Sequence, residues 1–290
     1  MKGAGLIKFS EYFREHIEDF DAILFDVDGT LASGRAVFPG IKEFLIFLEE
    51  INFPYLLLTN DACNSQQQKA AYLAKGGLPV TEKRVLSAGN AFELWVSSGN
   101  YDGRLFFQYG KFGTPSYIEA AGIKFTTDPA RINECSGVLC GEGIYEWQPA
   151  IEAAFNLLLK HPEYPMIVAN PDSYWPSLRL NGMGIGAGAV ARFICQVLAD
   201  AGKEVKPLYL GKPYPPIYQC AFPFLRRLFP GRSFDEPSRL IMVGDSLKSD
   251  IAGANANAIT SALVLSGVTN MEQVKNCSAK ERPQMTFSGV

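Results

Sequence analysis

The sequence is poor in the residues that build the commonest metal and hydrolytic centres. Its 290 residues include two histidines, His16 and His161, and six cysteines that never form a CxxC pair. A zinc site of the ordinary His/Cys type and a Ser-His-Asp triad are both hard to assemble from this inventory. The scattered cysteines predict reduced, buried thiols and a cytoplasmic location rather than a disulfide framework. If the chain is an enzyme, carboxylates must carry its chemistry.

The sequence also lacks a large excess of charge of either sign and any long apolar run. Lys and Arg total 27 against 30 Asp and Glu, a net charge of -3, so no positive excess offers itself to nucleic acid or to an anionic membrane. No apolar run approaches the roughly 20 residues that span a bilayer. The first residues lack the apolar core and cleavage site of a secretory signal. We therefore expect neither a nucleic-acid nor a membrane partner.

Short apolar runs alternate with helical patterns along most of the chain. Ile41, Phe44, Leu45 and Leu48 fall at i, i+3, i+4 and i+7 of a helix, and an apolar run lies on either side of them, at 22–25 and 55–58. This alternation predicts an α/β fold with a parallel sheet covered on both faces. The other strands expected in this sheet are 208–210, 239–243 and 262–265. A separate α/β segment is expected to have strands at 105–108, 138–140 and 166–169.

Polar residues gather where the predicted strands of the first sheet end. They are Asp26, Asp28, Gly29, Thr59, Asn60, Lys212, Asp245 and, at the start of a helix, Asp250. The carboxyl edge of a parallel sheet is where ligands bind, so we expect these side chains to converge. Close carboxylates repel one another unless a cation lies among them, and an all-oxygen donor set suits Mg²⁺. Each residue alone is also an ordinary turn or cap residue; the ordered combination indicates a site.

The strand-end segments read DVDGT (26–30), LLLTN (56–60), LGKP (210–213) and MVGDSLKSD (242–250). In this order they resemble the four motifs of the haloacid dehalogenase (HAD) superfamily, and its class IIA phosphatases in particular. Asp26 lies 33 residues before Thr59, whereas 153 residues separate Thr59 from Lys212. The resemblance implies a Rossmann-like core, residues 1–102 and 208–290, with an α/β cap domain, residues 103–207, inserted between motifs two and three.

The resemblance also implies a covalent mechanism. By motif position, Asp26 is the nucleophile that forms an aspartyl-phosphate. Asp28 is the acid that protonates the leaving oxygen and then the base that activates water. Mg²⁺ is expected to be held by Asp26, by the backbone carbonyl of Asp28 and by Asp245.

The remaining motif residues are expected to hold the phosphoryl group. Thr59 and Lys212 would contact its oxygens, and backbone N–H groups near Gly29 and Asn60 would complete the cradle. Two roles stay open for Asp250: support of the metal site from outside its ligand set, or a partner for Lys212.

Inside the predicted cap, Asp172 of the NPD segment, Arg179 and Asn181 are candidates for reading the substrate. For Asp172 a structural turn is an equal alternative. The run GMGIGAGA (182–189) contains GxGxxA, but the stretch before it is polar and broken by proline. Because a dinucleotide fingerprint needs a strand immediately before it, we favour a helix-start loop.

The function implied by the resemblance is Mg²⁺-dependent hydrolysis of a small phosphorylated metabolite, since a large cap excludes macromolecules. A phosphomutase or other phosphotransferase on the same scaffold is one alternative, and a non-catalytic binding or regulatory protein is another. Asp28 argues against a dehalogenase, which needs no acid at this position. Caps of this kind often form dimers, so a homodimer is also left open.

Overall fold

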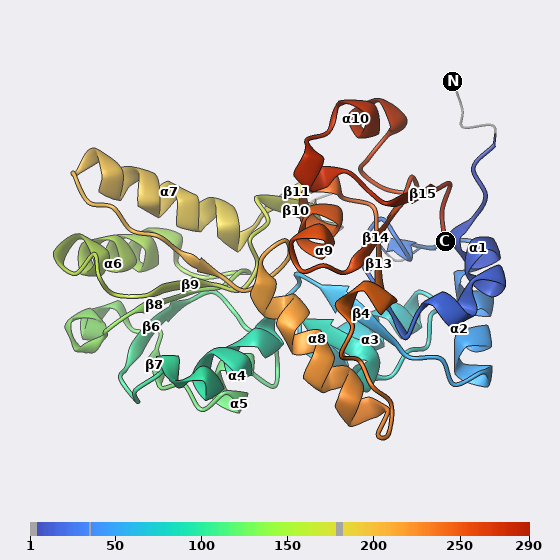
Figure 1. Cartoon of the computed structure of the whole chain (residues 1–290). Helices are drawn as coiled ribbons and strands as arrows, with labels where there is room; N and C mark the ends of the chain where they lie inside the picture. The colour runs from blue at the N-terminus through green and yellow to red at the C-terminus, as the bar shows by residue number, and fades with distance from the viewer. Residues whose placement is uncertain (1–4, 35, 178–181) are drawn as a thin grey trace. The chain divides into compact units, whose positions relative to one another are not determined.

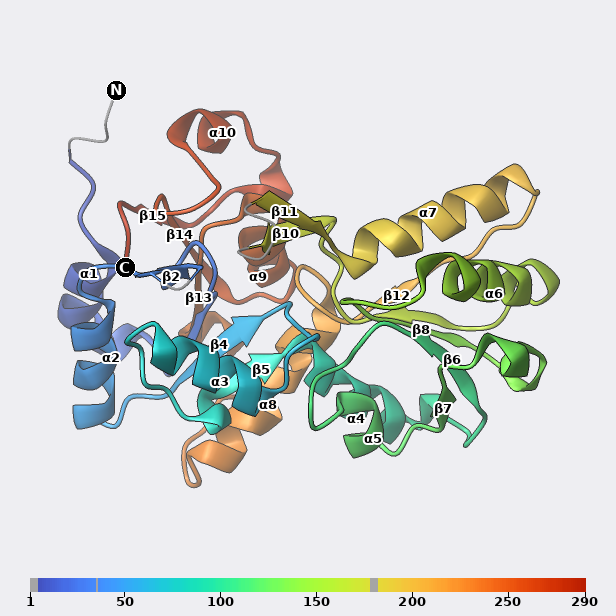
Figure 2. The ribbon, with the colours of Figure 1, turned by 180° about the vertical axis from the view of Figure 1, so that it is seen from behind.

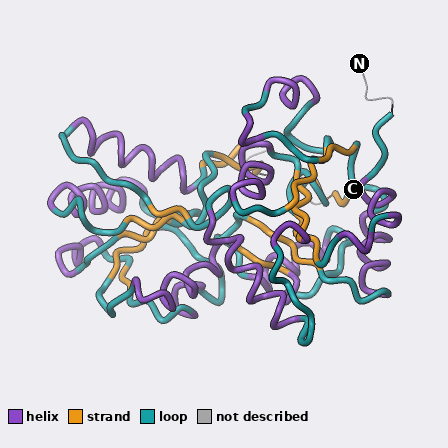
Figure 3. Tube along the Cα trace, in the orientation of Figure 1, coloured by secondary structure: helices purple, strands orange, loops and turns teal. Residues whose placement is uncertain are grey.

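The computed structural model describes residues 5–34, 36–177 and 182–290. The chain forms two compact units, and Figures 1 to 3 show that strands and helices alternate in each. The first unit contains Met1–Thr59, Lys69–Leu86 and Lys212–Val290, and the second contains Asn60–Gln68 and Ser87–Gly211. The chain thus leaves the first unit directly after Thr59 and enters it for the last time at Lys212.

The first unit is built on a six-stranded sheet. Its strand order is β15 (Met285–Phe287), β14 (Thr260–Val264), β13 (Leu240–Gly244), β1 (Ala22–Phe25), β4 (Tyr55–Thr59) and β5 (Val85–Ser87). The pairings from β15 through β4 are all parallel. All residues of the three central strands, β13, β1 and β4, are buried, as expected for a parallel sheet with helices on both faces.

Six α-helices of the described part of the chain belong to the segments around this sheet. They are α1 (Phe9–Glu15), α2 (Ile41–Glu50), α3 (Gln66–Lys75), α8 (Pro215–Leu228), α9 (Ala252–Ala256) and α10 (Met271–Asn276), and a hairpin of β2 (Ala32–Ser33) and β3 (Ala36–Val37) follows β1. The apolar face predicted for α2 is the one it buries. Phe9 of α1 packs its ring against Phe25 and Phe44, which ties the amino-terminal helix to the sheet. The helix expected to start at Asp250 begins as a π-helical turn, Leu247–Ile251, and continues as α9.

The second unit has a parallel sheet of its own. Its strand order is β12 (Leu208–Tyr209), β9 (Met166–Val168), β8 (Val138–Cys140), β6 (Phe106–Tyr109) and β7 (Phe125–Thr126). Its helices are α4 (Ala91–Trp95), α5 (Tyr117–Ala120), α6 (Trp147–Lys160) and α7 (Ala187–Asp200). Alternate strand residues such as Val138 and Cys140 share one apolar core with α6 and α7. Those two helices lie side by side in Figures 1 and 2.

The predicted α/β fold with a parallel sheet is confirmed, but three segments expected in the core, 60–68, 87–102 and 208–211, lie in the second unit. The strand at Leu208, expected in the first sheet, pairs with Ile167 of β9 in the second. Within the second unit, the Ser87 hydroxyl donates to the Asp61 carbonyl. In both cases the partner is distant in sequence, which a local pattern cannot show.

Three further observations bear on the sequence predictions. The six cysteines all lie among the described residues and form no disulfide. Within the same described ranges, every helix is too short or too polar to cross a bilayer. In the run GMGIGAGA, the first four residues form β11 (Gly182–Ile185), which pairs antiparallel with β10 (Tyr174–Ser177), and α7 starts just beyond. This hairpin is not the parallel strand that a dinucleotide fingerprint requires.

Candidate active site

Asp26 lies at the carboxyl end of β1, the strand flanked by β13 and β4. Its backbone N–H donates to the carbonyl of Val243, so the pairing with β13 continues to this residue and fixes its backbone. The side chain is almost completely buried. Lys212 donates to its Oδ1 over 2.5 Å, and the Thr30 hydroxyl donates to its Oδ2 over 3.2 Å. Both oxygens of Asp26 are therefore oriented by neighbouring side chains.

Lys212 is buried between two carboxylates. Besides Asp26, it donates to Oδ1 of Asp250 over 2.8 Å. The second oxygen of Asp250 accepts the backbone N–H of Ser246 over 3.1 Å. Burial alone would lower the pKa of Lys212, but the charges of Asp250 and Asp26 outweigh it and raise that pKa above its usual value. Of the two roles left open for Asp250, the geometry favours the partner of Lys212.

Asp245 follows β13 and is enclosed by backbone. A Cβ on Gly29 would lie 2.2 Å from its Oδ2, and a Cβ on Gly267 would lie 1.8 Å from the same atom. The backbone N–H of Val268 donates to this oxygen over 2.7 Å. Side chains at positions 29 and 267 would displace the carboxylate, so the two glycines allow Asp245 to reach its position.

The carboxylates of Asp26, Asp245 and Asp250 repel one another. Burial raises the pKa of Asp26 well above its usual range, an effect that Lys212 opposes and that Asp250 and Asp245 increase. Burial, and then the charge of Asp250, raise the pKa of Asp245 to about 7. Three acids and one lysine leave an excess of negative charge in a buried place. A bound cation would offset this excess.

The donor set fits a hard divalent cation. Asp26, Asp245 and Asp250 can each offer a carboxylate oxygen such that all three oxygens lie within 4.8 Å of one another. Oxygen donors alone suit Mg²⁺. By motif position Asp26 and Asp245 are the expected side-chain ligands of the three, whereas Asp250 bonds Lys212 and the N–H of Ser246.

Two predicted phosphate contacts receive different support from the geometry. Thr59 ends β4 next to β1 and is buried, so it lies at the same edge of the sheet as Asp26. The N–H of Gly29, in contrast, donates to the carbonyl of Ala32 over 2.7 Å, so it is not offered to a phosphate. Gly29 instead has a positive φ of 95° and makes room for Asp245.

Family models match both ends of this chain. One described as haloacid dehalogenase-like hydrolase matches residues 23–124, and one described as HAD-hydrolase-like matches residues 209–290. The chain belongs to the haloacid dehalogenase-like hydrolases. The predicted family, including its class IIA branch, is therefore confirmed.

Relatives of this HAD hydrolase resemble it over most of their length. Glycerol-3-phosphate phosphatase of Gallus gallus is 27% identical, covering 94% of this chain and 88% of its own. Dihydroxyacetone phosphatase of Corynebacterium glutamicum is 25% identical, covering 87% and 83%. A solved structure of a hypothetical protein from Pyrococcus horikoshii is 28% identical with a TM-score of 0.78, covering 93% and 96%.

The second unit of the HAD hydrolase holds the remaining predicted residues. Asn60 is buried and its amide donates to both carboxylate oxygens of Asp172, at 3.2 and 3.3 Å. The N–H of Asp172 donates to Oδ1 of Asn170 over 2.9 Å. Asp172 therefore closes a polar turn that is joined to motif two. Arg179 and Asn181, the other cap candidates, lie outside the described residues.

Sequence reasoning missed two charged residues. Lys69 of α3 is buried and its Nζ lies 3.0 Å from Oδ2 of Asp28. Glu142 follows β8, and its Oε1 accepts the amide of Asn170 and, over 3.2 Å, the N–H of Ala187 at the start of α7. Glu142 could have been found by applying the strand-end rule to the second sheet. Lys69 could have been found as a lysine on the buried face that α3 forms with Ala70 and Leu73.

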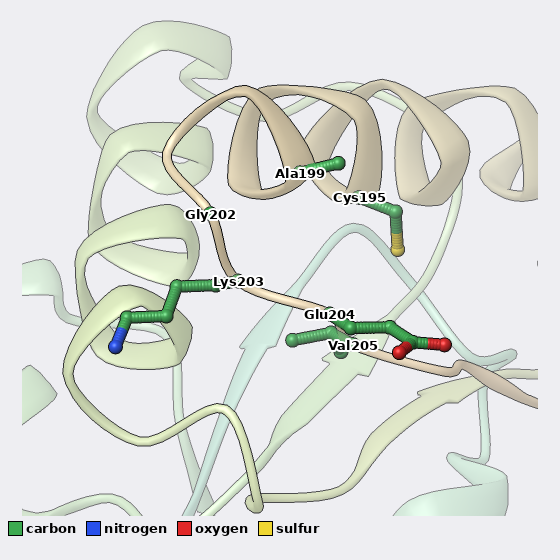
Figure 4. A pocket seen from close by; sticks show the side chains of 6 residues that line it. All are labelled: Cys195, Ala199, Gly202, Lys203, Glu204 and Val205. Atoms are coloured by element: carbon green, nitrogen blue, oxygen red, sulfur yellow. The ribbon is translucent and has the colours of Figure 1, made fainter.

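The second unit has a hollow of about 270 Å³, and Figure 4 shows the side chains that line it. It is lined by the end of α7 and the loop after it, namely Cys195, Ala199, Gly202, Lys203, Glu204 and Val205. Its two charged residues are exposed and of opposite sign. None of the predicted site residues lines this hollow, so the chemistry is better sought around Asp26.

Proposed function

We propose that this HAD hydrolase cleaves a small phosphomonoester in a Mg²⁺-dependent reaction that passes through an aspartyl-phosphate at Asp26. The chain's family and the phosphatases among its relatives show that it is a hydrolase acting on phosphoric monoesters. The observation that carries the proposed mechanism is the contact of one buried lysine, Lys212, with both Asp26 and Asp250.

In the first step, a carboxylate oxygen of Asp26 would attack phosphorus while the bond from phosphorus to the leaving oxygen breaks. Asp28 would give its proton to that oxygen, so the leaving group departs as an alcohol. The attack requires the ionised carboxylate, which burial disfavours and the charge of Lys212 favours. Thr59 and Lys212 would contact the transferring oxygens.

In the second step, Asp28, now ionised, would take a proton from water as the water oxygen bonds to phosphorus. The bond between phosphorus and Asp26 breaks, which releases inorganic phosphate and regenerates both carboxyl groups. The carboxylates of Asp26 and Asp245 and the carbonyl of Asp28 would hold Mg²⁺. When bound, the ion supplies positive charge that reduces the repulsion between carboxylate and phosphate.

The second unit is proposed to select the substrate as a cap. Its connections support this role, because the chain enters it directly after Thr59 and leaves it directly before Lys212, two proposed phosphate contacts. Two phosphatases among the relatives are named for three-carbon phosphates, which supports a phosphorylated metabolite of similar size. The cytoplasmic location and the homodimer stay predictions.

The proposal is tested with 4-nitrophenyl phosphate, assayed with and without Mg²⁺. The wild type should release phosphate only with the metal. Asp26→Asn should lower turnover by at least about a thousandfold, because the amide is not a nucleophile. Asp19→Asn, a change on the exposed surface, should behave as the wild type. Asp26→Asn activity within tenfold of the wild type would contradict the assignment.

A further inference from the structure

A lysine is buried in α3 where an apolar residue would be expected. The residues that α3 buries are Lys69, Ala70 and Leu73, and the Lys69 side chain is only 7% exposed. Burying an ammonium costs several kcal/mol unless an opposite charge lies close to it. An unbranched apolar residue would fill the same space without that cost. Lys69 therefore calls for an explanation beyond packing.

One anion that Lys69 contacts is the proposed acid and base of the reaction. Its Nζ donates to Oδ2 of Asp28 over 3.0 Å. The two partners differ in exposure, since the Asp28 side chain is 47% exposed. The buried ammonium is held by its surroundings, whereas a carboxylate exposed to this degree would otherwise move among its rotamers. The buried Lys69 therefore restricts the orientation of the Asp28 carboxylate.

The backbone beneath Asp28 is already fixed. The N–H of Gly29 and the carbonyl of Ala32 are bonded, as are the N–H of Ala32 and the carbonyl of Val27. What remains to be set is the direction of the Asp28 carboxyl group. Lys69 bonds one of its oxygens, Oδ2, and leaves Oδ1 outside this ion pair.

We propose that Lys69 is a positioning residue that holds the Asp28 carboxyl group in the orientation needed to exchange a proton with the leaving oxygen. This inference rests on the proposed function, because it presumes that Asp28 is the acid. A group displaced by about 1 Å from its productive position can lose about a hundredfold in rate. The loss should depend on how much the leaving group needs a proton.

The experiment measures the single-turnover release of the leaving group from two esters, glycerol phosphate and 4-nitrophenyl phosphate. For Lys69→Met, release from the alkyl ester should fall about 10- to 100-fold. Release of nitrophenolate, which departs without a proton, should change less than about threefold. Lys69→Gln should show the same selectivity if Lys69→Met does not fold, and Lys69→Arg should recover part of the alkyl rate.

Lys75→Met is the matched control, a lysine on the same helix that is exposed; it should leave both rates unchanged. An equal fall for both esters in folded Lys69 variants, or no fall for either, would overturn the positioning role. Failure of the proposed function looks different: the wild type would release neither leaving group, or Asp26→Asn would match it, whatever residue stands at position 69.

Discussion

Lys212 and Asp250 form an ion pair of 2.8 Å in which both side chains are almost wholly buried. The same ammonium reaches Asp26, 186 positions earlier in the chain. Asp250 itself is anchored by the N–H of Ser246. The π-helical turn after β13 therefore places the charge that keeps Lys212 directed toward the nucleophile.

Asp250→Asn should test this link. The amide keeps the shape of the carboxyl group and loses its charge, so Lys212 is held less firmly. We expect turnover of 4-nitrophenyl phosphate to fall about 10- to 100-fold, the usual cost of removing a supporting partner in a metal site. Asp200→Asn, an exposed change at the end of α7, is the control. Unchanged turnover in a folded Asp250→Asn protein would show that Lys212 needs no second carboxylate.

Asp28→Asn separates proton transfer from metal binding. It keeps the backbone carbonyl, so Mg²⁺ should bind as in the wild type, and it removes the acid, so turnover of an alkyl phosphate should fall about 10²- to 10⁴-fold. The checks are steady-state assays on glycerol phosphate and titration of Mg²⁺ by thermal shift. If metal binding is lost, the side chain of Asp28 is a ligand and its assigned role is wrong.

Mg²⁺ should stabilise the folded protein through Asp26 and Asp245. A ligand present at 100 times its Kd adds about 2.7 kcal/mol to the free energy of unfolding. We expect the Tm of the wild type to rise with Mg²⁺ and the rise to be much smaller in Asp245→Asn. Without metal, Asp245→Asn should have a higher Tm than the wild type, because the amide removes one of several buried like charges. Equal Mg²⁺ shifts in both proteins would exclude Asp245 as a ligand.

The sequence predicts the reactive groups better than their surroundings. Asp26 and Asp245 follow strands, and Thr59 ends one, whose apolar runs are visible in the sequence, and such strands end at a common edge of the sheet. Leu208 has the same local pattern, yet it pairs with β9 of the other sheet, because a strand's pattern does not name its partner. Lys69 contacts Asp28, 41 positions earlier in the chain, and no spacing rule connects the two.

The pH dependence of stability should reveal the raised pKa of the Glu142 carboxyl group. Burial raises its pKa to about 7 from the usual 4.5, although the N–H of Ala187 opposes the shift. Between these pH values the folded protein holds a proton that the unfolded chain has lost, so this group makes the folded state less stable as pH rises. Gln at this position can still accept from Asn170 and Ala187.

We therefore expect Glu142→Gln to gain stability relative to the wild type as the pH goes from 5 to 8. Urea unfolding at several pH values measures this difference. Glu119→Gln, at an exposed position of α5, should show no such trend. A constant difference between Glu142→Gln and the wild type across this range would mean that the carboxyl group ionises at its ordinary pKa.

Gly267→Ala should disable the metal site without touching a reactive group. The new Cβ would lie 1.8 Å from Oδ2 of Asp245, so the carboxylate must move. We expect Mg²⁺ affinity, measured by titration of activity, to fall about 10- to 100-fold. Gly289→Ala has no atom within 4 Å of its new Cβ and should bind as the wild type. Full affinity in Gly267→Ala would show that the loop carrying Gly267 moves and leaves the Asp245 carboxylate in place.

The glycines around Asp245 also affect how inert members of such a family are recognised. A gene copy could keep the codons for Asp26, Asp28, Lys212 and Asp245 and still encode an inactive protein after one base change at the codon for Gly29 or Gly267. A survey that scores only the reactive side chains would count that copy as an enzyme. Position 267, outside all four motifs, should therefore be included in any test that separates active phosphatases from inactive relatives.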